Sequence, residues 1–164
     1  MAARDRFLQI RVTATEKSLI ARAAARAGVD MSRWVLERAL PSDLRRFHRL
    51  LEALAADSAN RAFVLAELND FLSALTPAAF ARAVAETSTA ALDPWLANYV
   101  AAMVETAAHR KGVEPPAWTA SIAALPEPRF GSPLQSLRLH LLVNSPPAFR
   151  RRNLFIDSSI GDRV

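Results

Sequence analysis

The sequence contains no cysteine and only four glycines among its 164 residues. Without cysteine the chain can form neither a disulfide nor a thiolate metal site. Four widely spaced glycines provide no glycine-rich loop that could hold a phosphate group. No apolar run approaches the length of a membrane span, and the first residues lack the apolar core of a signal peptide. We therefore expect a cytoplasmic protein that does not contact a membrane.

Side chains suited to catalysis are also scarce. The three histidines, His48, His109 and His140, lie far apart in the sequence, and no serine stands in a nucleophile-elbow motif. Glu105 and His109 are four residues apart, as metal ligands on one helical face can be, but two ligands do not make a zinc site. We expect no enzyme activity, no catalytic residue, no metal site and no cofactor.

Positive charge is concentrated near the start of the chain. Residues 1–50 contain 11 Lys/Arg and 5 Asp/Glu, whereas the remaining residues contain 10 and 11. A basic surface attracts the phosphate backbone of nucleic acids. The charge distribution therefore favours a nucleic-acid contact near the N-terminus and a different role for the rest of the chain.

The first segment has the two-residue period of a β-strand. One face carries Leu8, Ile10 and Val12, and the other carries Phe7, Gln9, Arg11 and Thr13. A lone strand leaves its backbone polar groups unpaired, so we expect it to form an antiparallel ribbon with the same strand of a second copy. Such a ribbon fits the DNA major groove, where Arg reads guanine and Gln reads adenine. The alternative is an ordinary half-buried strand with a polar outer face.

Two helices are predicted to follow this strand. Thr13 to Glu16 has the form of a capping box, and Gly28 suits the left-handed residue that ends a helix. Asp30 can cap the second helix, and Pro41 interrupts the helical pattern after it. The free N–H groups at the start of the second helix, beside Ser32 and Arg33, could bind a phosphate.

The order of strand, helix and helix in residues 6–40 resembles the ribbon-helix-helix DNA-binding proteins, and more closely the bacterial antitoxins with this fold. The matching positions are residues 8–13, 16–17, 19–20, 23–24, 28–29 and 34–36. The resemblance implies a homodimer that binds operator DNA in the major groove. The DNA-binding residues it implies are Arg6, Gln9, Arg11, Thr13, Asp30, Met31, Ser32 and Arg33. Asp30 departs from the usual serine cap, and Arg33 stands where an acidic residue often closes a capping box.

The rest of the chain is predicted to be helical. Amphipathic patterns and capping side chains followed by proline predict helices at 43–56, 59–75, 77–90, 94–111, 133–143 and a short one from 146. One or two helical turns are expected within 117–124, and a loop at 125–131. The fold class is therefore mainly α, with a ribbon-helix-helix domain at 1–41. A helical domain at 42–164 would follow. It would bind a toxin or other partner and end in a short extended arm.

The C-terminal residues join a basic run to an apolar segment. Six candidate partner-binding residues lie there: Arg150, Arg151, Arg152, Leu154, Phe155 and Ile156. The apolar segment predicts a short strand or an extended arm that packs either on its own domain or into a partner. The arginines predict either contact with a partner or a nucleic acid, or a solvated face with one arginine paired internally. Segments 109–119 and 146–157 resemble a C-terminal region that recurs in bacterial proteins of antitoxin type.

The resemblance and the large helical appendage predict an antitoxin of a type II toxin–antitoxin system. It would neutralise a cognate protein toxin and repress its own operon. The alternative is a ribbon-helix-helix regulator whose helical domain senses a ligand or oligomerises. A ligand-sized cavity lined by Trp95, Tyr99 and Trp118 would favour that alternative. An enzyme that uses the ribbon only to dimerise is a further rival, which the lack of a convergent acid, base and nucleophile disfavours.

Overall fold

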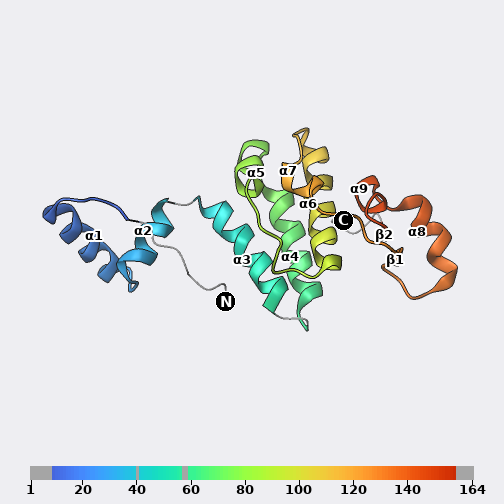
Figure 1. The fold of residues 1–164 in the computed structure, drawn as a ribbon, viewed down its shortest axis with the longest axis horizontal. Coiled ribbons are helices and arrows are strands. Elements are labelled where there is room, and N and C mark those ends of the chain that lie inside the picture. The colour runs from blue at the N-terminus through green and yellow to red at the C-terminus, as the bar shows by residue number, and fades with distance from the viewer. Residues whose placement is uncertain (1–8, 40, 57–58, 158–164) are drawn as a thin grey trace.

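The computed structural model describes residues 9–39, 41–56 and 59–157. Figure 1 shows three parts in succession along the longest axis of the molecule. A pair of helices, α1 (Ala14–Arg26) and α2 (Met31–Ala39), lies at one end. The middle part contains α3 (Ser42–Ala56), α4 (Arg61–Ala74), α5 (Pro77–Val84), α6 (Pro94–Lys111) and α7 (Ala117–Ala120). The other end contains β1 (Arg129–Phe130), the 3-10 helix η1 (Gln135–Leu137), α8 (Arg138–Asn144), α9 (Pro147–Arg150) and β2 (Leu154–Phe155).

The helix pair α1–α2 has almost no core of its own. The two helices pack mainly on each other and stand apart from the middle part (Figure 1). Ala24 is the buried residue of α1, and α2 has none. The turn between the helices contains Gly28, whose φ of 68° confirms the predicted left-handed position. Local capping and turn signals therefore define these helices better than burial does.

The predicted N-terminal strand is not confirmed. Residues 6–8 lie outside the described residues, and residues 9–13 have no regular secondary structure and are exposed. Within the described residues, the sheet is a two-stranded parallel pair formed by β1 and β2. A strand needs a neighbouring strand for its backbone N–H and C=O groups, and none of the described residues forms one beside residues 9–13.

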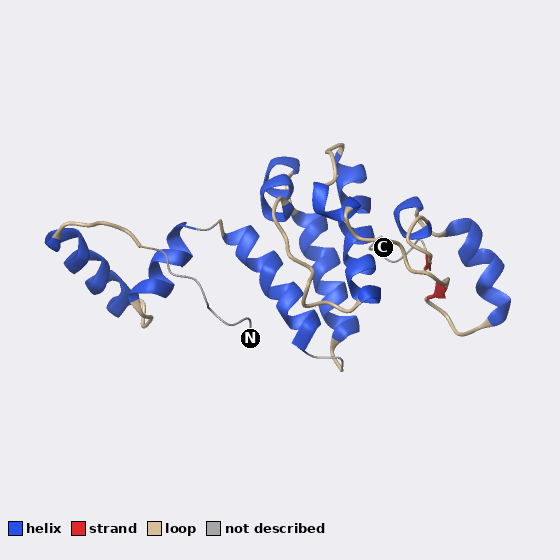
Figure 2. Cartoon of the chain, in the orientation of Figure 1, coloured by secondary structure: helices blue, strands red, loops and turns tan. Residues whose placement is uncertain are grey.

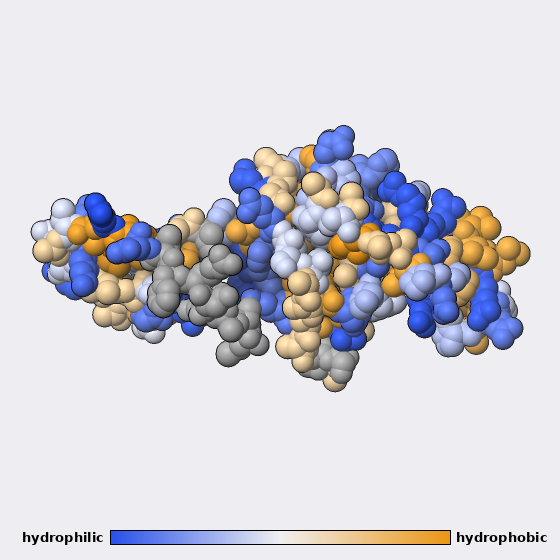
Figure 3. Space-filling view, in the orientation of Figure 1, coloured by the Kyte–Doolittle hydropathy of each residue, from blue (hydrophilic) through white to orange (hydrophobic). Residues whose placement is uncertain are grey.

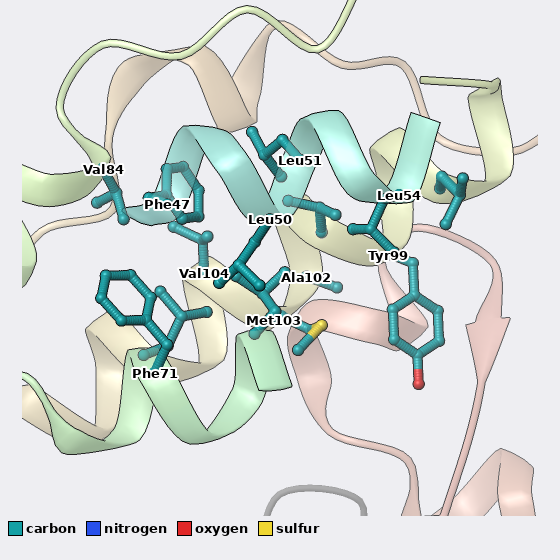
Figure 4. Close-up of a cluster of buried hydrophobic side chains, with 14 of the residues drawn as sticks. Phe47, Leu50, Leu51, Leu54, Phe71, Val84, Tyr99, Ala102, Met103 and Val104 are labelled. Atoms are coloured by element: carbon teal, nitrogen blue, oxygen red, sulfur yellow. The ribbon is translucent and has the colours of Figure 1, made fainter. Parts of the chain in front are cut away.

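The main hydrophobic core lies between α3, α4, α5 and α6. Figure 4 shows Phe47 and Leu50 of α3 close to Val104 of α6, and Leu54 of α3 close to Tyr99 of α6. The ring of Phe47 also stacks on that of Phe71 of α4, with centroids 6.5 Å apart. The sequence predicts an apolar face of α3 formed by Leu44, Phe47, Leu50, Leu51 and Leu54. The last four are buried and Leu44 is half-buried, so this face is confirmed. Each such side chain contributes about 1.5–3 kcal/mol when it is fully buried. Packing of these helices is therefore the main source of stability.

Helix α6 is the central element of this core. The side chain of Asp93 accepts a hydrogen bond from the Leu96 N–H at 2.9 Å, and Pro94 occupies the first turn, where no donor is needed. The helix ends at Gly112, whose φ is 64°. The residues from Leu96 to Val104 are buried. This segment lacks a clear polar face because a helix that is buried on all sides does not need one. The predicted bounds of 94–111 are confirmed.

Two other helices differ from their predicted bounds. Helix α5 ends at Val84 rather than at residue 90. Two side chains from distant segments contact backbone carbonyl oxygens at its end. The Trp118 indole N–H donates to Val84 O at 2.8 Å, and His48 Nε2 lies 3.1 Å from Glu86 O. The segment predicted as a helix from 133 begins instead with η1 and continues as α8.

The C-terminal segment folds back onto the rest of the chain. Strand β2 pairs in parallel with β1, with Arg129 opposite Leu154 and Phe130 opposite Phe155 (Figure 2). Part of the predicted loop at 125–131 is therefore a strand. Leu154, Phe155 and Ile156 are buried, so the apolar arm packs on its own domain, which was one of the two predicted outcomes. In the described ranges, no helix has both the length and the apolar character required to cross a bilayer.

The left-handed residue at the end of α6 gives a test of the fold. Replacing Gly112 by Ala should lower the free energy of unfolding by about 1 kcal/mol, because a Cβ disfavours positive φ. Nothing lies within 4 Å of the position of the added Cβ, so the cost is backbone strain and not a clash. Gly112→Asn is the matched control and should lose less, since Asn tolerates this conformation. Urea denaturation measures both, and equal stability of Gly112→Ala and wild type would contradict the assignment.

Candidate nucleic-acid and partner interfaces

The predicted base-reading residues lie in the exposed segment before α1. Gln9 and Arg11 are both exposed, and the segment runs in extended form into Thr13, whose φ and ψ are −70° and 162°. Arg6 lies outside the described residues. Gln9 and Arg11 therefore have side chains that are accessible to a ligand, in a segment without regular structure.

Thr13 has a structural role at the start of α1. Its hydroxyl accepts a hydrogen bond from the Glu16 N–H at 3.2 Å and donates to Glu16 Oε2 at 2.8 Å. The Thr13 N–H donates to the same carboxylate oxygen at 2.7 Å. This backbone hydrogen bond, and then that of the hydroxyl, lowers the pKa of Glu16 below its ordinary value. The predicted capping box is confirmed, and the Thr13 side chain is engaged within it.

The start of α2 presents the other predicted DNA contacts. Asp30 Oδ1 accepts a hydrogen bond from the Arg33 N–H at 2.9 Å, so the predicted cap is present. Met31, Ser32 and Arg33 are exposed. The Arg33 guanidinium pairs with Glu37 at 3.1 Å, and both side chains are largely exposed. Such an exposed pair contributes only about 0.3–0.5 kcal/mol, which leaves Arg33 able to exchange partners.

Apolar side chains are exposed around the same region. Ile10 and Val12 are 56% and 43% exposed, Leu19 on α1 is 53% exposed and Met31 on α2 is 38% exposed. Figure 3 shows apolar atoms at the surface of the α1–α2 end of the molecule. Ile10 and Val12 lie on the apolar face of the predicted strand. In a single copy they are open to solvent.

Arg152, predicted as a partner-binding residue, is instead buried within the protein. Only 6% of the residue is exposed. One terminal nitrogen donates to Glu105 Oε1 at 2.5 Å and to the Thr119 carbonyl at 2.7 Å. The other donates to Asn98 Oδ1 at 3.2 Å and to the Ile122 carbonyl at 3.4 Å. The guanidinium therefore joins α6 to α7 and to Ile122 after it, which matches the predicted alternative of one arginine paired internally.

The acceptors around Arg152 were not identified from the sequence. Asn98 is only 1% exposed, and its amide donates to the carbonyls of Pro94 and Ala123. Glu105 also lies 3.7 Å from Arg151 through its second oxygen. A single asparagine within the apolar run of α6 was the available signal, because a buried amide needs hydrogen-bond partners. The contact of Arg152 with Thr119 brings together segments 109–119 and 146–157, which resemble one recurrent region.

The six candidate partner-binding residues divide into two groups. Arg150 and Arg151 are exposed. Leu154, Phe155 and Ile156 are 1%, 9% and 2% exposed, and Phe155 stacks on Phe130 with ring centroids 5.1 Å apart. The apolar three and Arg152 therefore stabilise the fold and offer no surface to a partner while the fold is intact.

The aromatic residues that could have lined a ligand cavity belong to the core. Trp95 packs on Tyr99 at 5.0 Å, and Tyr99 meets Phe149 edge to face at 5.2 Å. Burial raises the pKa of Tyr99. An open hollow of about 440 Å³ lies elsewhere, between α7 and the Glu105–Arg152 pair. Among the described residues, no group of three or more His, Asp or Glu side chains could hold a metal ion.

A family model described as Antitoxin TacA 1-like matches residues 7–45. These residues comprise most of the predicted strand, α1, α2 and the first turn of α3. No curated protein and no solved structure matches the chain. The family match supports an antitoxin of a toxin–antitoxin system, and it therefore suggests a cognate toxin as a partner.

The hydrogen bonds of Arg152 predict that Arg152 contributes much more to the stability of the fold than its neighbour Arg151 does. Arg152→Met should lower the free energy of unfolding by about 3–5 kcal/mol, because it leaves the Glu105 carboxylate, whose side chain is only 12% exposed, without its main partner. Arg151→Met is the matched control: its side chain is 72% exposed, and its loss should cost about 0–1 kcal/mol. Urea denaturation followed by circular dichroism measures both. Similar losses for the two variants would mean that the buried network does not stabilise the fold.

Proposed function

We propose that this protein is a dimeric antitoxin that neutralises a protein toxin and represses its own operon by binding operator DNA. The observation that carries the proposal is the antitoxin family match, which falls on residues 7–45. The basic surplus of the N-terminal part and the exposed residues Gln9 and Arg11 support the DNA-binding half. The large helical body supports a second binding role.

The exposed apolar residues of the N-terminal part favour a second copy of the chain as its partner. Ile10, Val12 and Leu19 are all more than two-fifths exposed, and the helix pair buries little by itself. Pairing of residues 9–13 with the same segment of another copy would satisfy their backbone groups and bury this apolar face. Four helices would then cover one side of a two-stranded ribbon.

A ribbon of this kind would present Gln9 and Arg11 to the DNA major groove. Arg makes paired hydrogen bonds with guanine, and Gln makes them with adenine. The N–H groups at the start of α2, beside Ser32 and Arg33, would contact phosphates on either side. Thr13 would position the ribbon relative to α1 through its capping box rather than read a base.

DNA binding can be tested on the full chain with DNA from its own promoter. Gln9→Ala and Arg11→Ala should each weaken specific binding by about 1–3 kcal/mol, since each removes a base contact. Arg82→Ala is the control, because Arg82 is an exposed arginine on α5. Fluorescence anisotropy with promoter DNA and with an unrelated duplex measures the specific part. Unchanged affinity in both variants would exclude the proposed reading surface.

Toxin neutralisation can be tested by co-expression. The chain is expressed together with the product of each flanking gene, and growth and co-purification are scored. We expect one flanking product to arrest growth alone, to be harmless with the full chain, and to co-purify with it. Growth arrest that the chain does not relieve, or relief without a complex, would contradict neutralisation by direct binding.

A further inference from the structure

Five exposed apolar residues lie together in the sequence on α8 and in the turn before it. Leu139 is 73% exposed, Val143 is 64% exposed and Leu142 is 42% exposed. In the preceding turn, Leu134 and Leu137 are 58% and 39% exposed. Figure 3 shows this apolar surface at the α8 end of the molecule. We call these five residues the α8 face.

The spacing along α8 explains why these side chains are on the outside. Leu139, Leu142 and Val143 are three and four residues apart and so lie on one side of the helix. Leu141 points inward and is 3% exposed. A seven-residue helix that is apolar on two sides can bury only one of them against its own chain. The described residues leave the α8 face uncovered.

The α8 face is held by a folded support. The Ser145 hydroxyl, at the end of α8, donates to the Ile156 carbonyl at 2.7 Å and lies 2.6 Å from the Leu141 carbonyl. At the other end of the helix, the Arg138 guanidinium lies 5.1 Å from the centre of the Phe130 ring, which stacks on Phe155. The face therefore exists before any partner binds, and ordering it costs little on association.

Arginine outnumbers acidic residues in the segment that carries the α8 face. Residues 128–156 contain five arginines and no aspartate or glutamate. Arg129 and Arg138, which border Phe130, are exposed. Asp157, the first acidic residue after this stretch, lies 3.5 Å from His140. The surface is thus an apolar face with a basic border.

We propose that the α8 face binds a protein partner through an apolar groove bordered by carboxylates. A helix with apolar side chains at these spacings is suited to a groove of this kind, and an acidic border complements Arg129 and Arg138. A second copy of the chain is disfavoured, because two α8 faces would bring like charges together. This inference rests on the proposed function, under which the partner is the toxin.

The test uses the full chain and the flanking gene product that arrests growth. The double variant Leu139→Glu/Val143→Glu should weaken binding to that product by about tenfold or more, because it places two carboxylates in the apolar contact. Phe63→Glu is the matched control, since Phe63 on α4 is 71% exposed and lies on another element. It should bind as wild type does. Biolayer interferometry measures the affinities, and circular dichroism establishes that each variant is folded.

A second pair of variants tests the basic border. Arg129→Glu/Arg138→Glu should also weaken binding by about tenfold, and raising the salt concentration should weaken binding by the wild type. If the Leu139/Val143 variant does not fold, Leu139→Gln alone gives the same comparison. Wild-type affinity in the folded variants overturns the inference and leaves toxin neutralisation intact. Absence of any binding by the wild-type chain instead overturns the proposed function, and this inference with it.

Two further measurements distinguish other occupants of the α8 face. In sedimentation velocity experiments, a self-association of the wild type that Leu139→Glu/Val143→Glu removes would identify a second copy. Co-sedimentation with phosphatidylserine-containing vesicles that the same variant abolishes would identify a membrane surface. Either result, with toxin affinity unchanged, overturns the inference.

Discussion

The buried guanidinium of Arg152 determines how the second half of the chain is arranged. It donates to two side chains of α6 and to two carbonyls in the segment around α7. An arginine withdrawn from water costs several kcal/mol unless good acceptors surround it. These acceptors come from α6, from α7 and from Ile122 after it, so the four hydrogen bonds of the terminal nitrogens hold these parts of the chain together. The Nε atom is buried without a hydrogen-bond partner among the described residues.

The two ends of the molecule differ from the middle in how they are stabilised. The middle part has a continuous core in which α6 is buried along most of its length. The helix pair α1–α2 has one buried residue, and each of the five apolar residues of the α8 face is more than a third exposed. A soluble protein rarely leaves such surfaces without a partner. The proposed function assigns a binding role to each of these exposed apolar surfaces.

Several elements could be predicted because their signals are local. The capping box at Thr13 and the cap at Asp30 each involve atoms within three residues of each other, and the left-handed glycine that ends α6 acts through its own backbone. The bounds of α5 could not be predicted, since its end is set by Trp118 and His48 from distant segments. The predicted strand before α1 is not confirmed, because a strand there would need a neighbouring strand that the described residues of a single copy do not provide.

The candidate binding residues at the C-terminus show the same difference between local signals and contacts with distant segments. The amino-acid sequence by itself determined that a basic run adjoins an apolar segment, because adjacency is a property of the chain. Only the tertiary structure decided that Arg152 and the apolar segment are internal, that Arg151 is exposed, and that α8 carries the uncovered apolar side chains. The physical reason is that burial depends on which distant residues supply hydrogen-bond acceptors and packing surface. Asn98, Glu105 and Thr119 do so for Arg152, whereas the described residues leave the outer side of α8 uncovered.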